Sequence, residues 1–360
     1  MSITAQLLDS VRLPGAGALV NGFAFEGRRD GLGRALLLKG HELAAHELDE
    51  LLAGERAPRA VFPLPWPGWG HGVHSVSPDG TFAVFSGQRS VRAVDAGGAT
   101  RWEYRHGCWD QEIGHEHTGD ERQICPGIES GSCRISDDGR FVWAHVVEGE
   151  DEEWQELWVV LDAADGTELA RLPLDSVTSG SHHLSHPDGV HMALDIGMGQ
   201  DGILLHWGRW DGDKLTTWDL NETMDRILMD VHPEHPGFLT VEHYGHDIQL
   251  HDLAGTVVAE VEPPQPRDDE EDPLGWDWAC GFVDATTVIA STMEYGDDPE
   301  DHKHWLLDAH TLEIRGTVDY PTGPVDGFAR PLGDGTWLTY DQESGTLSRW
   351  GLNPPTPAAS

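Results

Sequence analysis

The sequence is poor in positive charge, and above all in lysine. Against 63 acidic residues it has 23 basic ones, which gives a formal net charge of −40, and only Lys39, Lys214 and Lys303 are lysines. A surface of this sign repels phosphate backbones, so we expect no nucleic-acid partner. We attribute the total charge to compositional bias or salt adaptation and consider separately where the acidic residues cluster.

Long hydrophobic runs are also missing. No run approaches the roughly 20 apolar residues that span a bilayer, and "MSITAQLLDSVRLPGAG" lacks the basic start and apolar middle of a signal peptide. We therefore expect a cytoplasmic protein with no membrane partner. Its four cysteines are expected to be thiols rather than a disulfide framework. Cys133 and Cys280 fall in apolar strand-like segments and should pack as small hydrophobic residues.

Familiar catalytic signatures are absent from the sequence. It has no Gly-x-Ser-x-Gly elbow, no phosphate-binding glycine loop and no dinucleotide fingerprint, and the glycines of "GMGQDG" are not followed by a helical pattern. No reaction class follows from motifs.

What the sequence does contain is a repeat. A unit of strand, glycine turn and strand recurs about every 50 residues, as in "VHSVSPDGTFAVFSG", "SCRISDDGRFVWAHV" and "HHLSHPDGVHMALDI". The turn positions are Gly31, Gly80, Gly139, Gly189, Gly237, Ala285 and Gly335. A second hairpin follows in most units, so each unit predicts four short strands, a to d. "HELAAHELDELLAG" could pass for a helix alone, but its place in the repeat predicts strand, turn, strand.

Seven four-stranded units predict an all-β fold, a seven-bladed β-propeller of antiparallel blades that occupies residues 1–353 as one domain. The last unit stops after three strands, and we expect the N-terminal strand, about residues 3–13, to complete that blade and close the ring. Residues 354–360 are expected to be a disordered tail. The chain resembles WD-repeat and quinoprotein-like propellers over nearly its whole length, although the Gly-His and Trp-Asp pairs of WD repeats are not repeated. The resemblance implies a ring with a central channel and no particular activity.

Loop lengths distinguish the two faces of the expected ring. The a–b and c–d turns, on what we call the turn face, are short. The insertions, among them residues 105–129, 262–276 and 293–304, are all b–c or d–a loops on the opposite face, the loop face. Long loops on a rigid scaffold carry function or reflect drift, and the sequence leaves their order open.

One insertion, "HGCWDQEIGHEHTGDERQIC", contains candidate metal ligands. Cys108, His115, His117 and Cys125 supply the thiolate and imidazole donors that zinc and copper prefer. Their spacing matches no standard zinc motif, so a disulfide and an ordinary solvated loop remain alternatives. A divalent transition metal (Zn, Cu or Mn) is the cofactor that the sequence would accommodate.

A second set of polar residues begins the a strands, which surround the axis of the expected ring. They are Asn21, His71, His74, Glu129, His182, His183, Asp230, Asp277, Trp278 and Asp326. They could hold a metal, supply a general base, or simply form a polar wall. His183 is the residue we would most readily assign a function. Because adjacent strand residues point in opposite directions, His182 and His183 cannot both face the axis.

Acidic residues interleaved with tryptophan form a third feature, in "EGEDEEW", "DDEEDPLGWDW" and "DDPEDHKHW". Carboxylates beside indole faces attract cations. The predicted binding residues are Trp154, Trp276, Asp277, Trp278, Trp305, Asp230 and Asp326. The expected partner is a basic peptide or protein, or a cationic small molecule. The alternative is that these tryptophans begin buried strands.

Three hypotheses of function follow. The first is a cytoplasmic binding or scaffold protein that recognises a cationic partner on its acidic, aromatic face. The second is a metal-dependent lyase or hydrolase at the channel mouth, similar in outline to propeller lyases that use histidines and a divalent ion. In that case His183 or His71 would be the base, and Glu129, Asp277 and Asp326 would be ligands or orienting groups. A metal-binding or redox-sensing protein built on Cys108 and Cys125 is a third possibility.

Overall fold

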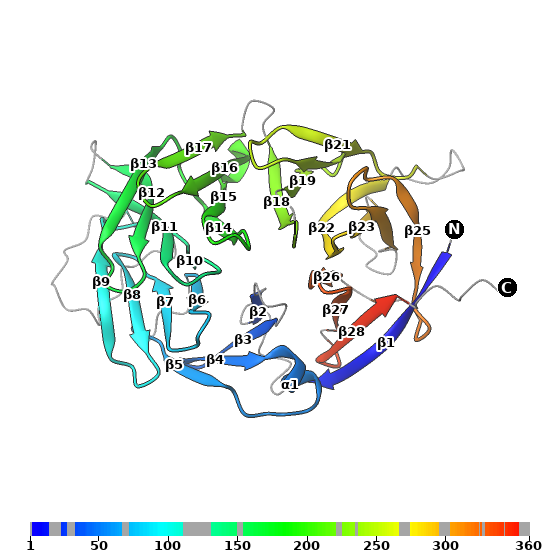
Figure 1. Ribbon diagram of the computed structural model, residues 1–360, viewed down its shortest axis with the longest axis horizontal. Helices are drawn as coiled ribbons and strands as arrows, with labels where there is room; N and C mark the ends of the chain where they lie inside the picture. The colour runs from blue at the N-terminus through cyan, green and yellow to red at the C-terminus, as the bar shows by residue number, and fades with distance from the viewer. Residues whose placement is uncertain are drawn as a thin grey trace.

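The structure is a computed structural model that describes residues 2–13, 23–26, 33–66, 72–110, 131–149, 154–220, 225–234, 237–265, 274–294, 303–323, 325, 328–341 and 343–352. The described strands form a ring of antiparallel sheets (Figure 1). Much of the expected insertions, at residues 111–130, 150–153, 266–273 and 295–302, and the expected tail at 354–360 lie outside the described residues.

Five sheets contain four strands each, and the spatial order of the strands follows the chain. We call these sheets blades one to five. Blade one contains β2 (Phe23–Glu26), β3 (Arg34–Lys39), β4 (Glu42–Glu47) and β5 (Ala60–Pro63), and blade two contains β6 (His74–Val76), β7 (Phe82–Ser86), β8 (Ser90–Asp95) and β9 (Thr100–Arg105). Blade three contains β10 (Cys133–Ile135), β11 (Phe141–Glu148), β12 (Gln155–Asp162) and β13 (Glu168–Leu174), and blade four contains β14 (Gly180–Ser185), β15 (His191–Gly197), β16 (Ile203–Trp210) and β17 (Leu215–Asp219). Blade five contains β18 (Arg226–Val231), β19 (Phe238–Glu242), β20 (Ile248–His251) and β21 (Val257–Val261).

The remaining strands form one eight-stranded sheet that divides into two blades. Blade six is β22 (Leu274–Asp284), β23 (Thr287–Glu294), β24 (Lys303–Asp308) and β25 (Ile314–Asp319). Blade seven is β26 (Arg330–Pro331), β27 (Thr336–Asp341), β28 (Thr346–Leu352) and β1 (Ser2–Arg12). The division falls where β1 makes a short parallel contact with β25, from Ser2↔Thr317 to Thr4↔Asp319.

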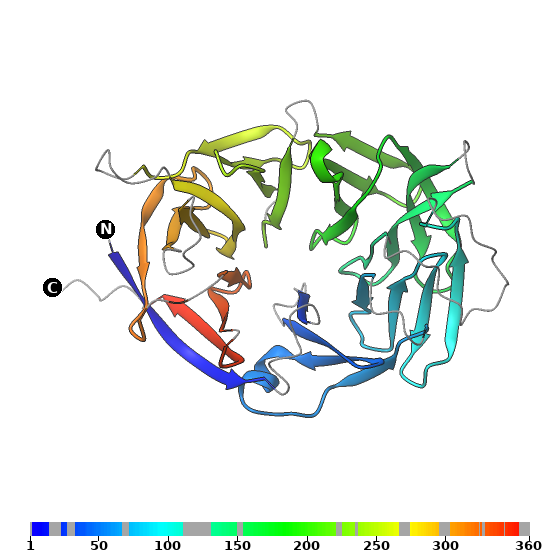
Figure 2. The ribbon, with the colours of Figure 1, turned by 180° about the vertical axis from the view of Figure 1, so that it is seen from behind.

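The all-β prediction and the expected closure of the ring are both confirmed. β1 pairs antiparallel with β28, from Ala5↔Leu352 to Arg12↔Thr346, so the N-terminal strand becomes the outer strand of the last blade. In each blade the first strand lies nearest the ring axis and the fourth lies at the rim, and Figure 2 shows the same ring from behind. The inner a strands therefore surround the ring axis, as the repeat predicted.

A hydrophobic cluster lies between each pair of neighbouring blades among the described residues. Between blades three and four, for example, Trp143 and Trp158 pack against Met192 and Leu194, and all four are fully buried. Since burying a large apolar side chain contributes about 1.5–3 kcal/mol, these interfaces hold the ring together.

The glycine turns and the strand pattern have a clear physical basis. Gly139 and Gly189 have φ angles of 75°, in the left-handed region that side chains avoid, so the repeated Asp-Gly turns need glycine there. β13 alternates between half-buried and exposed residues until its end, as an outer strand should.

One local prediction is wrong. After β4, residues Leu48–Leu52 form the short helix α1 rather than a strand, because Leu48, Leu51 and Leu52 bury one helical face against blades one and seven. A 3-10 turn, η3, spans Gly199–Asp201. In the part of the chain that the structure describes, no helix has the length and apolar character needed to cross a membrane.

Candidate functional site

His183, the residue first expected to be functional, is buried in the wall between blades three and four. The indole Nε1 of Trp158 donates to its Nε2 at 2.9 Å, and its Nδ1 lies 2.8 Å from Ser132 Oγ. Because an indole nitrogen can only donate, Nε2 is the acceptor and Nδ1 carries the proton. Burial lowers the pKa of His183 well below its usual value. The ring is neutral and fully engaged, so its position fits a structural role.

From Ser132 the hydrogen bonds continue through Ser181 of blade four to His145 of blade three. Ser132 Oγ lies 2.7 Å from Ser181 Oγ, which lies 2.9 Å from Nδ1 of His145, and Nε2 of His145 lies 2.9 Å from Glu156 Oε2. Burial alone would raise the pKa of Glu156, but hydrogen bonds from His145, Ser176 and Thr178 outweigh it and hold that pKa below its usual value. The chain of donors ends on a buried carboxylate.

The other residues expected at the axis are dispersed. His182 points away from His183, as predicted, and its side chain keeps 60% of its surface exposed. His71, Glu129 and Asp326 lie outside the described residues. The structure therefore describes only some of the residues that were expected to bind a metal or act as a base at the channel mouth.

Asp230 connects blades five and six rather than facing a partner. Its Oδ2 accepts from the backbone N–H of Phe282 at 2.8 Å and its Oδ1 from that of Val231 at 2.8 Å. Burial raises the pKa of Asp230 to about 7, which the two backbone donors only partly oppose. The carboxyl group is an element of the blade interface, contrary to its expected place on a binding surface.

Two of the predicted tryptophan anchors belong to the core. Trp276 has no exposed surface and donates from Nε1 to the Val261 carbonyl oxygen at 3.1 Å. Trp305 is half-buried and donates to Thr292 Oγ1 at 2.9 Å. In blade seven, Trp350 on strand c donates in the same way to Thr339 on strand b. The indole of Trp305 thus connects two strands of its own blade by a hydrogen bond.

The side chains of Trp154 and Asp277, two further predicted binding residues, are largely covered by the protein. Trp154 is half-buried, with its ring centroid 6.5 Å from that of Trp109. Asp277 is buried, and its Oδ1 accepts from the backbone N–H of Trp278 at 2.7 Å. These residues fit a supporting role better than direct recognition.

Trp278, one of the predicted binding residues, is exposed and is the centre of an aromatic surface on the loop face. Its indole stacks on the imidazole of His243, with centroids 5.0 Å apart, and its Nε1 donates to the His243 carbonyl oxygen at 2.9 Å. Tyr244 packs beside His243 at 5.1 Å, and His246 follows at 6.1 Å from Tyr244. We call these four residues the aromatic patch. Trp278 is 49% and Tyr244 56% exposed.

The b–c loop of blade five, Glu242 to Asp247, positions the patch by docking on blade six. The backbone N–H of Trp276 donates to the carbonyl oxygen of Gly245 at 2.8 Å. The backbone N–H of Gly245 in turn donates to the carbonyl oxygen of Glu242 at 2.8 Å. Gly245 has a φ of 75°, and a Cβ there would lie 2.3 Å from the Trp276 carbonyl oxygen. Only glycine allows this approach, so the loop and the start of β22 form one rigid surface.

Carboxylates surround the patch. Oε2 of Glu242 lies 3.1 Å from Nδ1 of His246 and accepts from the backbone N–H of Tyr244 at 2.8 Å. Oδ1 of Asp225 lies 3.4 Å from Nδ1 of His243. Aromatic faces next to fixed negative charges attract cations electrostatically.

Trp278 was predicted from the sequence, whereas the segment "EHYGH", residues 242–246, was not. Its signal was present, because this short b–c loop on the loop face carries three aromatic or imidazole side chains around a glycine. A loop of ordinary length gives a weaker signal of function in the sequence than a long insertion does.

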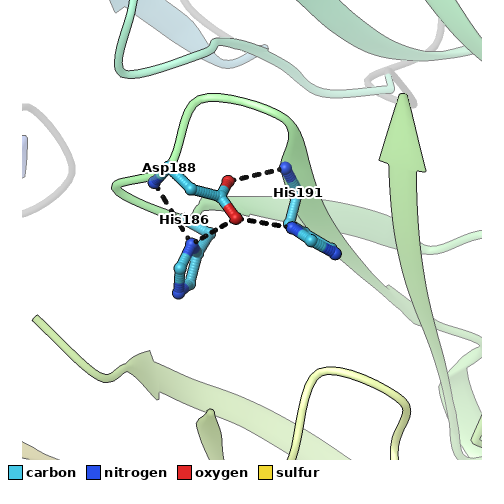
Figure 3. Close-up of side chains that lie close together, drawn as sticks. All are labelled: His186, Asp188 and His191. Carbon is cyan, nitrogen blue, oxygen red and sulfur yellow. Dashed lines mark hydrogen bonds and ion pairs between the residues drawn. The ribbon is translucent and has the colours of Figure 1, made fainter. Parts of the chain in front are cut away.

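The residues that could hold a metal differ from those expected. Cys108 is buried, while His115, His117 and Cys125 lie outside the described residues. Within the described residues, one group has suitable donors close together: His186, Asp188 and His191, in the a–b turn of blade four (Figure 3). Cys133 and Cys280 are buried among apolar residues, as expected.

Comparison with known proteins identifies the fold. No protein-family model and no curated protein matches the chain. Among solved structures, the Cps50 (Swd1) β-propeller domain of Myceliophteria thermophila matches with 12% identity and a TM-score of 0.55, over 96% of this chain and 100% of that one. At this identity the likeness shows the fold alone, so the chain is a β-propeller and the architectural resemblance is confirmed.

Two further solved structures are similar at lower scores. BamB from Moraxella catarrhalis has 11% identity and a TM-score of 0.43, over 98% of this chain and 99% of its own. The dihydro-heme d1 dehydrogenase NirN, in complex with DHE, has 16% identity and a TM-score of 0.49, over 92% of this chain and 63% of its own.

Proposed function

We propose that this propeller is a cytoplasmic binding or scaffold protein whose aromatic patch recognises a cationic partner. The partner is a lysine- or arginine-rich segment of a protein, or a small ammonium compound. The observation that carries the proposal is the exposed stack of Trp278 on His243, extended by Tyr244 and flanked by carboxylates.

Three properties of the patch support this choice of partner. First, its large aromatic side chains are exposed although most tryptophans of the chain are buried, and exposed aromatic groups of this kind are typical interface anchors. Second, the docked loop fixes the rings before binding, which reduces the entropy lost on association. Third, the net charge of −40 raises the local concentration of cations around the whole molecule.

The test uses the full chain and two length-matched peptides, one arginine-rich and one glutamate-rich, in isothermal titration calorimetry. We expect the arginine-rich peptide alone to bind and its affinity to fall as salt is added. Trp278→Ala and Tyr244→Ala should each weaken binding by about tenfold or more, since interface anchors cost at least 1–2 kcal/mol on truncation.

Val258→Ala is the matched control. Val258 is 55% exposed on β21, the outer strand of the same blade, away from the loop that carries the patch. The proposal is wrong if Trp278→Ala and Val258→Ala bind the arginine-rich peptide equally well, or if binding is insensitive to salt.

A further inference from the structure

The a–b turn of blade four differs in chemistry from the corresponding turns of blades two and three. There, Ser77 and Ser136 begin the turn and donate to Asp79 and Asp138, each at 2.7 Å. In blade four the position of the serine is taken by His186, while the aspartate, Asp188, is retained.

The residue that follows the turn is changed as well. It is Phe82 in blade two, Phe141 in blade three and Phe238 in blade five, but His191 in blade four. Blades two and three therefore fold this turn without either histidine, and blade five has only the first one, His232. In blade four both histidines are present and lie beside one carboxylate.

The three side chains converge on one point (Figure 3). Oδ2 of Asp188 lies 2.6 Å from Nδ1 of His191 and 3.1 Å from Nδ1 of His186, and the three donor atoms lie within 4.8 Å of one another. Zinc–nitrogen and zinc–oxygen bonds of about 2.0–2.2 Å in a tetrahedral site require donors roughly 3.4 Å apart, so only a small opening is needed.

The carboxylate is held in place for this role. Its Oδ1 accepts from the backbone N–H groups of Val190 at 2.9 Å and His191 at 3.0 Å, which leaves Oδ2 directed at the two imidazoles. Outer hydrogen bonds of this kind orient metal ligands.

The contacts of His186 also favour a positive ion at this point. Nδ1 of His186 lies 3.2 Å from the backbone nitrogen of Asp188 and 3.1 Å from Oδ2 of Asp188. A cation between Nδ1 and Oδ2, either the imidazole proton or a metal ion that replaces it, stabilises this approach. Nε2 of His186 is buried and has no hydrogen-bond partner among the described residues, so the polar contacts of this ring are all made by Nδ1.

Burial is graded in a way that allows an ion to enter. The imidazoles of His186 and His191 are nearly covered, packed on Trp207 with ring centroids 6.2 and 5.9 Å away, whereas the side chain of Asp188 is 33% exposed. The carboxylate is thus the ligand that solvent reaches, and water from that side could complete the coordination of a bound ion.

We propose that His186, Asp188 and His191 bind one divalent transition-metal ion of the zinc class on the turn face of blade four. Two imidazoles and a carboxylate are a donor set that zinc accepts. The site is separate from the aromatic patch, which belongs to the b–c loop of another blade on the loop face, so it does not depend on the function proposed above.

The test titrates Zn²⁺ into metal-free full-length protein and compares it with His186→Ser/His191→Phe. This double variant restores the residues found at the turns of blades two and three, so the turn should still fold, which a thermal melt checks. We expect wild type to bind one Zn²⁺ here and the double variant to lose more than about 100-fold in affinity, since even loss of an outer partner costs 10–100-fold. Nitrogen-15 NMR of the histidines should place the ion on Nδ1.

Two controls locate the metal. His232→Ser removes the histidine that begins the equivalent turn of blade five, where Nδ1 accepts from the backbone N–H of Glu234 at 3.1 Å, and it should leave Zn²⁺ binding unchanged. His115→Ala/His117→Ala should do the same. The proposal is overturned if wild type binds no Zn²⁺, if the double variant keeps wild-type affinity, or if binding is lost only in His115→Ala/His117→Ala. In each case the three residues form only a hydrogen-bonded turn.

Discussion

Nε1 of Trp158 and Nε2 of His183 lie 2.9 Å apart, and the hydrogen bond between them joins blade three to blade four. The donor belongs to strand c of one blade and the acceptor to strand a of the next. Neighbouring blades are thus held by a directed polar contact as well as by their apolar cluster.

His183→Ala should therefore destabilise the fold. It leaves the buried Trp158 Nε1 without its acceptor and removes one of the two hydrogen bonds of Ser132. We expect a loss of about 2–4 kcal/mol in the free energy of unfolding, measured by urea denaturation. His182→Ala, at the exposed neighbour, should change it by less than about 0.5 kcal/mol. Equal stability of the two variants would show that the hydrogen bond contributes nothing.

Asp230 should give the stability a characteristic pH dependence. Burial raises the pKa of its carboxyl group to about 7 in the folded protein, whereas an unfolded aspartate titrates near 4. Between these values the folded state holds a proton that the unfolded state lacks, so stability rises as pH falls from about 7 to about 4. Asp230→Asn should reduce this rise, measured as the slope of unfolding free energy against pH. Asp9→Asn, on the exposed side of β1, is the control, and an unchanged slope in Asp230→Asn would contradict the assignment.

Gly245→Ala should weaken both the fold and the partner binding. The left-handed φ costs about 1–2 kcal/mol for a residue with a side chain, and the added Cβ collides with the Trp276 carbonyl oxygen. Gly40→Ala isolates the first effect, because Gly40 has a φ of 63° and nothing within 4 Å of an added Cβ. We expect Gly245→Ala to be the less stable variant and the only one with impaired binding of the arginine-rich peptide in calorimetry. If the two variants behave alike, the loop is not docked as described.

Closure of the ring can be tested at β1. Ala5 is buried between blades six and seven, and Ala5→Asp places an unpaired charge there. We expect a loss of more than about 3 kcal/mol in unfolding free energy, since an uncompensated buried charge costs about 3–5 kcal/mol. Gln6→Asp, on the adjacent exposed residue, should be close to neutral in the same denaturation experiment. Similar stabilities would mean that β1 contributes little to the ring.

The repeat was readable because each blade needs the same turn chemistry, and Gly139 and Gly189 mark it directly. The opposite orientations of His182 and His183 followed from strand geometry alone. Trp276 and Trp278 were not separable in this way. They are two residues apart and should share one face of a regular strand, but the pairing of β22 with β23 shifts register between Trp276 and Cys280. That irregularity buries one indole and exposes the other.

Neither the aromatic patch nor the His186 cluster was predicted from the sequence, for a different reason in each case. The aromatic patch depends on Gly245 meeting the backbone of another blade, which no local pattern encodes. The residues of the His186 cluster are adjacent in the sequence, in "HPDGVH". They lie in a short turn of the turn face, however, and the long loops had directed the prediction of function to the opposite face.

The pairing of β1 with β28 also has a consequence for the order in which the protein forms. β1 precedes all the other strands in the sequence and its antiparallel partner β28 follows them, so β1 cannot pair with β28 until the intervening blades have been synthesised. Until then blade seven and the flank of blade one stay open to water, and a long-range contact of this kind is slow to form. A chain that ends before β28 would consequently keep β1 as an unpaired strand edge, which favours aggregation.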